Sequence, residues 1–92
     1  MPVSHYLCWN GPCEGQLVTD CPAEIDVGYA CAVPFKTKTG HDRYAVYILL
    51  QNDAGARGLV FEKQYTTPAG AQRRVQYVTH AVRLHNTGIA LN

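Results

Sequence analysis

Four cysteines are the side chains of this sequence with the clearest potential for chemistry, and all of them precede residue 32. Their spacing is Cys8-x4-Cys13-x7-Cys21-x9-Cys31, so no pair has the C-x-x-C spacing that is typical of zinc sites and redox motifs. His5 precedes Cys8 by three residues, and one interpretation is therefore a zinc site built from His5, Cys8, Cys13 and Cys21.

A second interpretation leaves the cysteines without a metal. In a reducing compartment, cysteines are more often thiols or metal ligands than disulfides, although a Cys8–Cys13 bridge across residues 10–12 is sterically possible. We expect Cys8 and Cys31 to be small core residues on strands, and Cys13 and Cys21 to lie in turns. On this interpretation the protein needs neither a metal nor another cofactor.

The histidines are the other candidates for chemistry, as acid–base catalysts or metal ligands. His41 is followed by Asp42 in a polar segment, but no Ser or Cys is linked to it by a known local pattern. His80 and His85 are five residues apart, or about 140° around a helix, which is poor spacing for a shared metal. Carboxylates are few and scattered, and no phosphate-binding glycine loop is present. We therefore expect a protein that binds and does not catalyse.

The charged residues divide the chain into two parts. Residues 1–35 contain four acidic side chains and no basic one, so their formal charge is −4. Residues 36–92 contain eight basic and three acidic side chains, so their formal charge is +5. This asymmetry predicts charged partners: nucleic acid or nucleoprotein for the basic part, and a basic protein surface for the acidic part. Alternatively, the two parts pair with each other across the fold, which contributes ~0–1 kcal/mol per exposed pair.

We expect exposed basic and aromatic side chains, together with the early carboxylates, to bind the partner. Arg73 and Arg74 are adjacent on a predicted helix, and Trp9 flanks a turn, where an aromatic side chain is a natural interface anchor. The predicted partner-binding residues are Lys36, Lys38, Arg43, Arg57, Arg73, Arg74, Tyr77, Arg83, Trp9, Asp20, Glu24 and Asp26.

Local patterns predict the strands that position these residues. Residues 4–9 and 16–20 should form an N-terminal hairpin, and residues 43–51 and 58–66 should form a second one around a turn that contains Gly55. Apolar residues alternate over residues 25–33, which predicts a further strand that Pro34 ends or redirects.

A helix should follow the second hairpin. Thr67 is a good N-cap and Pro68 suits the first helical position, and no further Pro occurs over residues 69–85, so we expect a helix that opens at Pro68. Its apolar stripe is Ala71, Val75, Val78 and Val82, spaced as in a helix that packs on a sheet. Together these elements predict a single α+β domain over residues 1–92, with an antiparallel sheet of four to five strands and one C-terminal α-helix packed on one face.

The sequence gives no sign of export or of membrane insertion. Its longest uncharged apolar run, residues 44–50, is much shorter than the ~20 residues of a membrane-spanning helix. The first residues lack the positively charged and long apolar regions of a signal peptide. We therefore expect a cytoplasmic protein.

Three features of the whole chain point to a family resemblance. They are the start MPVSHYLCWNGPCEGQ, the β-rich middle and the late helical segment TPAGAQRRVQYVTHAV. With these features the chain resembles phage-encoded anti-CRISPR proteins of the group that inhibits type I-F surveillance complexes. The resemblance implies a non-enzymatic inhibitor in the cytoplasm of the infected bacterial host. Its implied partners are subunits of the CRISPR-Cas surveillance complex, with the crRNA as a further candidate, and it would block binding of target DNA.

Two other functions are compatible with the sequence. One is a small nucleic-acid-binding protein that acts alone, in which tyrosines stack on bases and basic side chains contact phosphates. The other is a zinc-stabilised interaction module built on the His5, Cys8, Cys13 and Cys21 set.

Overall fold

The fold comprises two small antiparallel sheets and one helix. The computed structural model describes residues 3–23 and 25–86, with side chains described for residues 4–23 and 25–78. Strands β1 and β2 form a two-stranded sheet, and β3, β4 and β5 form a three-stranded sheet in that order. The elements in chain order are β1 (Val3–Leu7), the 3-10 turn η1 (Gly11–Cys13), β2 (Leu17–Pro22), β3 (Ala30–Lys36), β4 (Asp42–Gln51), β5 (Arg57–Tyr65) and α1 (Pro68–Asn86).

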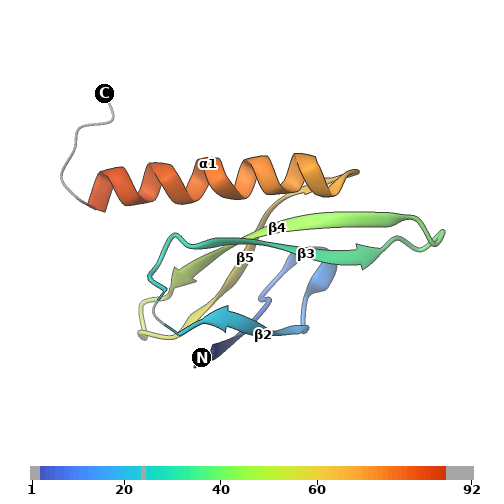
Figure 1. Ribbon diagram of the computed structural model, residues 1–92. Helices are drawn as coiled ribbons and strands as arrows, with labels where there is room; N and C mark the ends of the chain where they lie inside the picture. The colour runs from blue at the N-terminus through green and yellow to red at the C-terminus, as the bar shows by residue number, and fades with distance from the viewer. Residues whose placement is uncertain (1–2, 24, 87–92) are drawn as a thin grey trace.

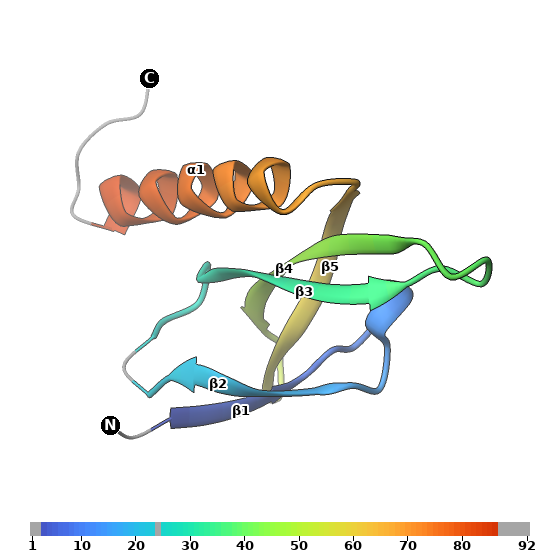
Figure 2. The same cartoon turned by 45° about the vertical axis from the view of Figure 1, so that its right-hand side comes forward.

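The elements are stacked in three layers. Figures 1 and 2 show α1 on one face of the three-stranded sheet and the β1–β2 hairpin on the other side. Because strand side chains alternate between faces, the central strand β4 contributes buried side chains to both faces of the three-stranded sheet. Tyr47 and Leu49 pack with Cys8 in the core beneath the hairpin, whereas Val46 points to the opposite face and is buried, as is Ala71 of α1. The α+β class and the helix on one face are thus confirmed, but the single sheet of four to five strands is wrong.

The two sheets are separate because the described chain just after β1 pairs with β5 through a single isolated bridge and no ladder. Cys8 and Leu59 form an isolated parallel bridge, next to which the Trp9 N–H donates to the Leu59 carbonyl at 2.8 Å. The chain then turns away from β5, so its backbone forms no further ladder with that strand. The Asn10 side chain takes the place of a backbone acceptor, because its Oδ1 accepts a hydrogen bond from the Phe61 N–H of β5 at 2.8 Å.

Both predicted hairpins and the predicted helix are confirmed. The β1–β2 pair has a bulge between Ser4 and Tyr6, and the β4–β5 pair has one between Val46 and Tyr47. Thr67 caps α1 as expected, since its Oγ1 accepts from the Gly70 N–H at 3.1 Å. Of the predicted stripe, Ala71 is buried, Val75 and Val78 are half-buried, and the Val82 side chain lies outside the described residues.

The predicted strand at 25–33 is wrong in its first half. Before β3, the Asp26 side chain accepts from the Val27 N–H at 2.7 Å, and the Tyr29 N–H donates to the Asp26 carbonyl at 3.1 Å. Gly28 has a φ of 98°, which other residues rarely adopt. These turn-forming preferences outweigh the apolar alternation. Pro34 does not end the strand either, because it lies inside β3, an edge strand where a missing N–H is tolerated.

A buried hydroxyl joins η1 to the three-stranded sheet. Tyr47 is fully buried, and its Oη donates to the Asn10 carbonyl at 2.7 Å and accepts from the Cys13 N–H at 2.9 Å. Burial raises the pKa of Tyr47 well above its usual value, so the hydroxyl remains protonated and able to donate.

Removal of this hydroxyl should destabilise the fold. Tyr47→Phe leaves the Cys13 N–H and the Asn10 carbonyl without their partner, so we expect the free energy of unfolding to fall by about 1–3 kcal/mol. The control is Tyr44→Phe, because the Tyr44 hydroxyl makes no hydrogen bond to any described residue. Urea unfolding followed by circular dichroism measures both. Equal losses in the two variants would contradict this role of Tyr47.

Two glycines with similar backbone angles test the packing of η1 against β5. Gly11 and Gly15 have φ values of 76° and 86°, so alanine strains both by about 1–2 kcal/mol. A Cβ on Gly11 would lie 2.5 Å from the Phe61 Cβ, whereas a Cβ on Gly15 would meet nothing within 4 Å. We expect Gly11→Ala to lower the free energy of unfolding by a further ~1–3 kcal/mol relative to Gly15→Ala. Similar thermal and urea midpoints for the two variants would show that η1 is not held against Phe61.

Candidate polyanion-binding surface

The four cysteines are free thiols held in and around the core. Cys8, Cys13 and Cys21 are buried and Cys31 is half-buried. Burial, reinforced by the neighbouring thiols, raises the pKa of Cys8 to about 11 and that of Cys31 to about 12. Because the thiolate is the reactive form, such thiols are poor nucleophiles near neutral pH. The prediction of core residues on strands is confirmed in part, since Cys8 is buried but follows the end of β1, and Cys31 lies in β3 but is half-buried. Cys13 lies in the turn η1 as expected, whereas Cys21 lies in β2 and not in a turn.

The arrangement of the thiols does not favour the zinc module. Among the side chains that the structure describes, those of residues 4–23 and 25–78, no group of three or more His, Cys, Asp or Glu is placed to hold a metal ion. His5 is exposed and its Nδ1 lies 3.2 Å from the Thr19 carbonyl, whereas the thiols of Cys8, Cys13 and Cys21 are buried.

One end of the molecule gathers most of the predicted basic residues. Strand β4 reverses β3 and β5 reverses β4, so the β3–β4 turn lies at the same end as the last residues of β5, where Tyr44 is opposite Tyr65. Helix α1 starts at this end, as Figure 1 shows. We call this region, with the first half of α1, the basic end. Its residues are Lys36, Lys38, Arg43, Lys63, Tyr65, Arg73, Arg74 and Tyr77.

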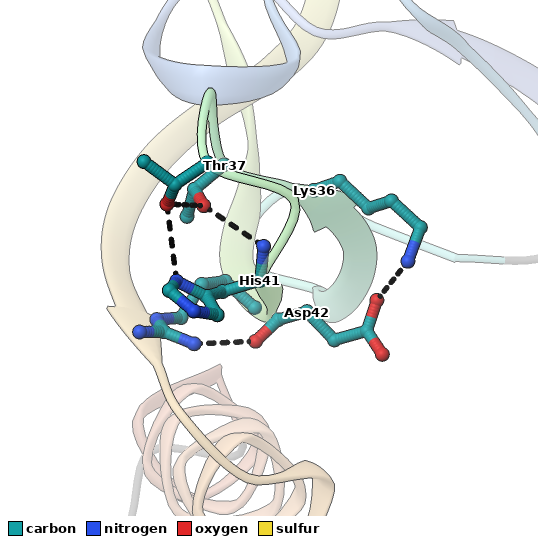
Figure 3. A network of polar contacts seen from close by, with 6 residues as sticks. Lys36, Thr37, His41 and Asp42 are labelled. Atoms are coloured by element: carbon teal, nitrogen blue, oxygen red, sulfur yellow. Dashed lines mark hydrogen bonds and ion pairs between the residues drawn. The ribbon is translucent and has the colours of Figure 1, made fainter.

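Polar contacts order the β3–β4 turn. Figure 3 shows the Lys36 Nζ bound to the Asp42 Oδ1, at 2.8 Å, and the His41 N–H donating to the Thr37 Oγ1, at 3.1 Å. The ion pair raises the pKa of Lys36 and lowers that of Asp42. The His41 Nδ1 lies 3.0 Å from the Thr39 Oγ1 and Asp42 pairs with Lys36, so both side chains take part in the contacts that order this turn. The turn therefore presents Lys38 on a preformed loop.

A shallow hollow lies beside this turn. It has a volume of about 250 Å³ and is lined by Pro34, Phe35, Tyr44 and the Lys36–Asp42 pair. Aromatic and charged residues in combination are typical of surfaces that bind nucleobases.

Cations and tyrosine rings alternate on β5 and α1. The Lys63 Nζ lies 5.5 Å from the centre of the Tyr65 ring, and the Arg74 guanidinium lies 5.4 Å from the centre of the Tyr77 ring. Arg74 also pairs with Glu62 at 2.6 Å, and this hydrogen-bonded pair raises the pKa of Arg74. Tyr77 remains 67% exposed, which leaves one face of its ring available for stacking.

Ion pairing leaves a net positive charge at the basic end. Lys36 and Arg74 are neutralised by Asp42 and Glu62. None of the described carboxylates forms an ion pair with the remaining cations of this end, which are Lys38, Arg43, Lys63 and Arg73. Uncompensated cations interleaved with exposed aromatic rings are the composition of a surface that binds phosphates and bases.

The structure places the other predicted residues elsewhere. Arg57 lies beside the β4–β5 turn at the opposite end, 3.6 Å from Asp26, and this is the single ion pair between described residues that joins the acidic and basic parts of the chain. Trp9 is half-buried against Gly58, where an added Cβ would overlap the indole ring. Asp20 is exposed on β2, while Glu24 and the Arg83 side chain lie outside the described residues.

Sequence reasoning missed two members of the basic end, Lys63 and Tyr65. They are two residues apart, so they share a face of a strand, and they lie just before the helix N-cap Thr67. That spacing could have predicted their place at the basic end. A strand that leads directly into a helix positions its last side chains beside the first turns of that helix.

Comparison of the sequence and the structure with known proteins finds no similar protein. No protein-family model, curated protein or solved structure matches this chain. In the part of the chain that the structure covers, no helix combines the length and apolar character needed to cross a bilayer. The proposed function therefore rests on the residues of the basic end.

The raised thiol pKa values predict slow alkylation in the folded state. A rise in the Cys8 pKa from 9.0 to about 11 lowers its thiolate fraction about 100-fold near neutral pH. We expect iodoacetamide to label Cys8 and Cys31 at least about 100-fold more slowly in buffer than in urea, as measured by mass spectrometry of tryptic peptides. A thiol labelled equally fast in both conditions would show that it is accessible and ionised in the native protein.

Proposed function

We propose that the protein is a non-enzymatic inhibitor that binds a protein–nucleic-acid complex through the basic end. The observation that carries the proposal is the pairing of cations with tyrosine rings, Lys63 with Tyr65 and Arg74 with Tyr77, beside the uncompensated charge of Arg73. The resemblance to anti-CRISPR proteins suggests the target, a CRISPR-Cas surveillance complex with its crRNA. The site of action would then be the cytoplasm of the infected bacterial host.

Phosphate binding by this surface would be driven by its uncompensated cations. Each phosphate contact made by Lys38, Arg43, Lys63 or Arg73 releases condensed counterions, so binding should weaken as salt rises. An exposed ring such as Tyr77 adds about 1–3 kcal/mol when a base stacks on it. The hydrogen-bonded β3–β4 turn is already ordered, so little conformational entropy is lost when it docks.

Inhibition by this route needs no chemical step. A protein bound where target DNA must enter blocks the DNA sterically, and its position is selected by charge complementarity, which also speeds association. Protein subunits that surround a crRNA carry Lys and Arg for its backbone, so acidic residues of the inhibitor can contact them while the basic end approaches the RNA.

A second function is supported by the exposed Tyr77 ring beside Arg74. Proteins that bind single-stranded nucleic acid without a protein partner combine stacking rings with uncompensated cations, which at the basic end are Lys38, Arg43, Lys63 and Arg73. This alternative predicts that the protein binds free oligonucleotides at low salt, whereas the inhibitor proposal requires binding to the assembled complex.

Charge reversal at the basic end should weaken inhibition. We expect the double variant Lys63→Glu with Arg73→Glu to need at least about tenfold more protein for half-inhibition of target DNA binding by a purified type I-F surveillance complex. The matched control is Arg57→Glu, an Arg-to-Glu reversal at the opposite end, which should shift inhibition by less than about twofold. Arg74 is unsuitable for this test, because a carboxylate there would lie against Glu62, whose side chain is only 22% exposed, whereas the Asp26 beside Arg57 is 76% exposed and screened by water.

The same assay separates the two functions. Unchanged DNA binding by the surveillance complex in the presence of wild-type protein would refute the inhibitor proposal. Retardation of a free oligonucleotide by the same sample would then favour the stand-alone nucleic-acid-binding protein. Equal loss of inhibition in the Arg57→Glu control would show that the basic end is not the specific contact.

A further inference from the structure

A groove of about 270 Å³ separates β2 from β3. Residues 16–20 form one wall and residues 32–34 form the other. Each strand is the outermost of its sheet, so neither is hydrogen bonded to another strand on the groove side. Figure 2 shows the two strands next to each other with no strand between them. The groove is therefore bounded by two free strand edges.

Hydrogen bonds on the far side of β3 show which backbone groups face the groove. The Leu49 N–H donates to the Tyr29 carbonyl at 2.8 Å, and the Thr37 N–H donates to the His41 carbonyl at 2.9 Å. The register between β3 and β4 is unbroken from Ala30 to Lys36, so alternate residues from 29 to 37 bond to β4. The backbone groups of Ala32 and Pro34 consequently point to the groove. Ala32 offers a donor and an acceptor there, and Pro34 offers an acceptor alone.

The same alternation applies to β2. The Gln16 carbonyl accepts from the Cys8 N–H at 2.9 Å, and Val18 is paired with Tyr6, so these residues bond to β1. Leu17 lies between them, and its backbone N–H and C=O point away from β1. Both walls of the groove thus offer the backbone groups to which an added strand bonds.

The groove is lined by apolar residues, by the uncharged polar residues Gln16 and Thr19, and by one acid. Leu17 is 51% exposed and lies directly opposite Leu7 of β1, which is 43% exposed. Among the residues that the structure describes, Asp20 is the only charged one that lines the groove, and residues 1–35 contain no Lys or Arg. Lys36 follows the β3 wall, but its ammonium is bound by Asp42 at 2.8 Å. The chemistry that complements this lining is an extended segment with apolar and basic side chains.

We propose that this groove binds an extended basic segment of a partner protein by strand addition. The segment exchanges backbone hydrogen bonds with Ala32 of β3, packs apolar side chains on Leu17 and directs Lys or Arg towards Asp20. The inference is independent of the proposed function, because it concerns other residues than the basic end and needs no nucleic acid.

A designed peptide tests the groove directly. The probe is a seven-residue peptide of alternating Lys and Val with blocked ends, titrated into the ¹⁵N-labelled full chain and followed by NMR amide shifts. We expect shifts concentrated at residues 17–20 and 32–33, and no such shifts with a peptide in which Glu replaces Lys. Asp20→Lys should weaken binding at least about fivefold, whereas Asp53→Lys, the same change in the β4–β5 turn, should alter it less than about twofold.

A backbone variant isolates the strand-addition step. Ala32→Pro removes an N–H that does not bond to β4, and β3 already tolerates a proline two residues later, at Pro34. This variant should abolish the amide shifts that the Lys–Val peptide causes at residues 17–20. If this variant fails to fold, the Asp20→Lys and Asp53→Lys pair decides. The proposal is overturned by three results: no shift with the Lys–Val peptide at millimolar concentration, equal binding of the Glu–Val peptide, or groove shifts that survive both Ala32→Pro and Asp20→Lys.

Discussion

The hydrogen bonds of the Tyr47 hydroxyl are the constraint on which the rest of the structure depends. Fully buried on the central strand, this group bonds to the Asn10 carbonyl and the Cys13 N–H, and so fixes both ends of the turn that follows β1. With that turn held, the Asn10 side chain can accept from Phe61 of β5. The β1–β2 hairpin is therefore attached to the three-stranded sheet through the polar contacts of this turn, the isolated Cys8–Leu59 bridge and the shared apolar core, and not through a continuous ladder. Its outer strand consequently remains unpaired beside β3, which creates the groove.

Features that depend on neighbouring residues could be predicted from the sequence. The two hairpins and the Thr67 cap follow from turn residues and side-chain periodicity, and they lie where expected. The separation into two sheets could not be predicted, because it depends on contacts such as Tyr47 with Asn10 that are 37 residues apart in the chain. The turn at Asp26 was missed for another reason. Its alternating apolar pattern matched a strand, but a side-chain acceptor and Gly28 locally favoured a turn.

The candidate site shows the same division. Charge counting predicted a basic part of the chain, and the antiparallel order of β3, β4 and β5 gathers much of it at one end. A charge count from the sequence could not show which charges are neutralised, because that depends on the ion pairs Lys36–Asp42 and Arg74–Glu62. It also could not show that Arg57 lies at the opposite end, where it pairs with Asp26 of the acidic part. The thiols, which first suggested zinc chemistry, are instead core groups whose burial suppresses their ionisation.

Two surfaces of opposite character therefore follow from one fold. The basic end carries uncompensated cations and tyrosine rings, and the groove between β2 and β3 carries free strand edges with an acidic side chain. We propose that the basic end contacts the nucleoprotein target, and hydrogen–deuterium exchange of the protein, free and bound to a purified type I-F surveillance complex, tests this contact. Slowed exchange on binding is expected in residues 36–43 and 63–77. Protection confined to the β4–β5 turn at residues 52–56, or unchanged exchange throughout, would contradict it.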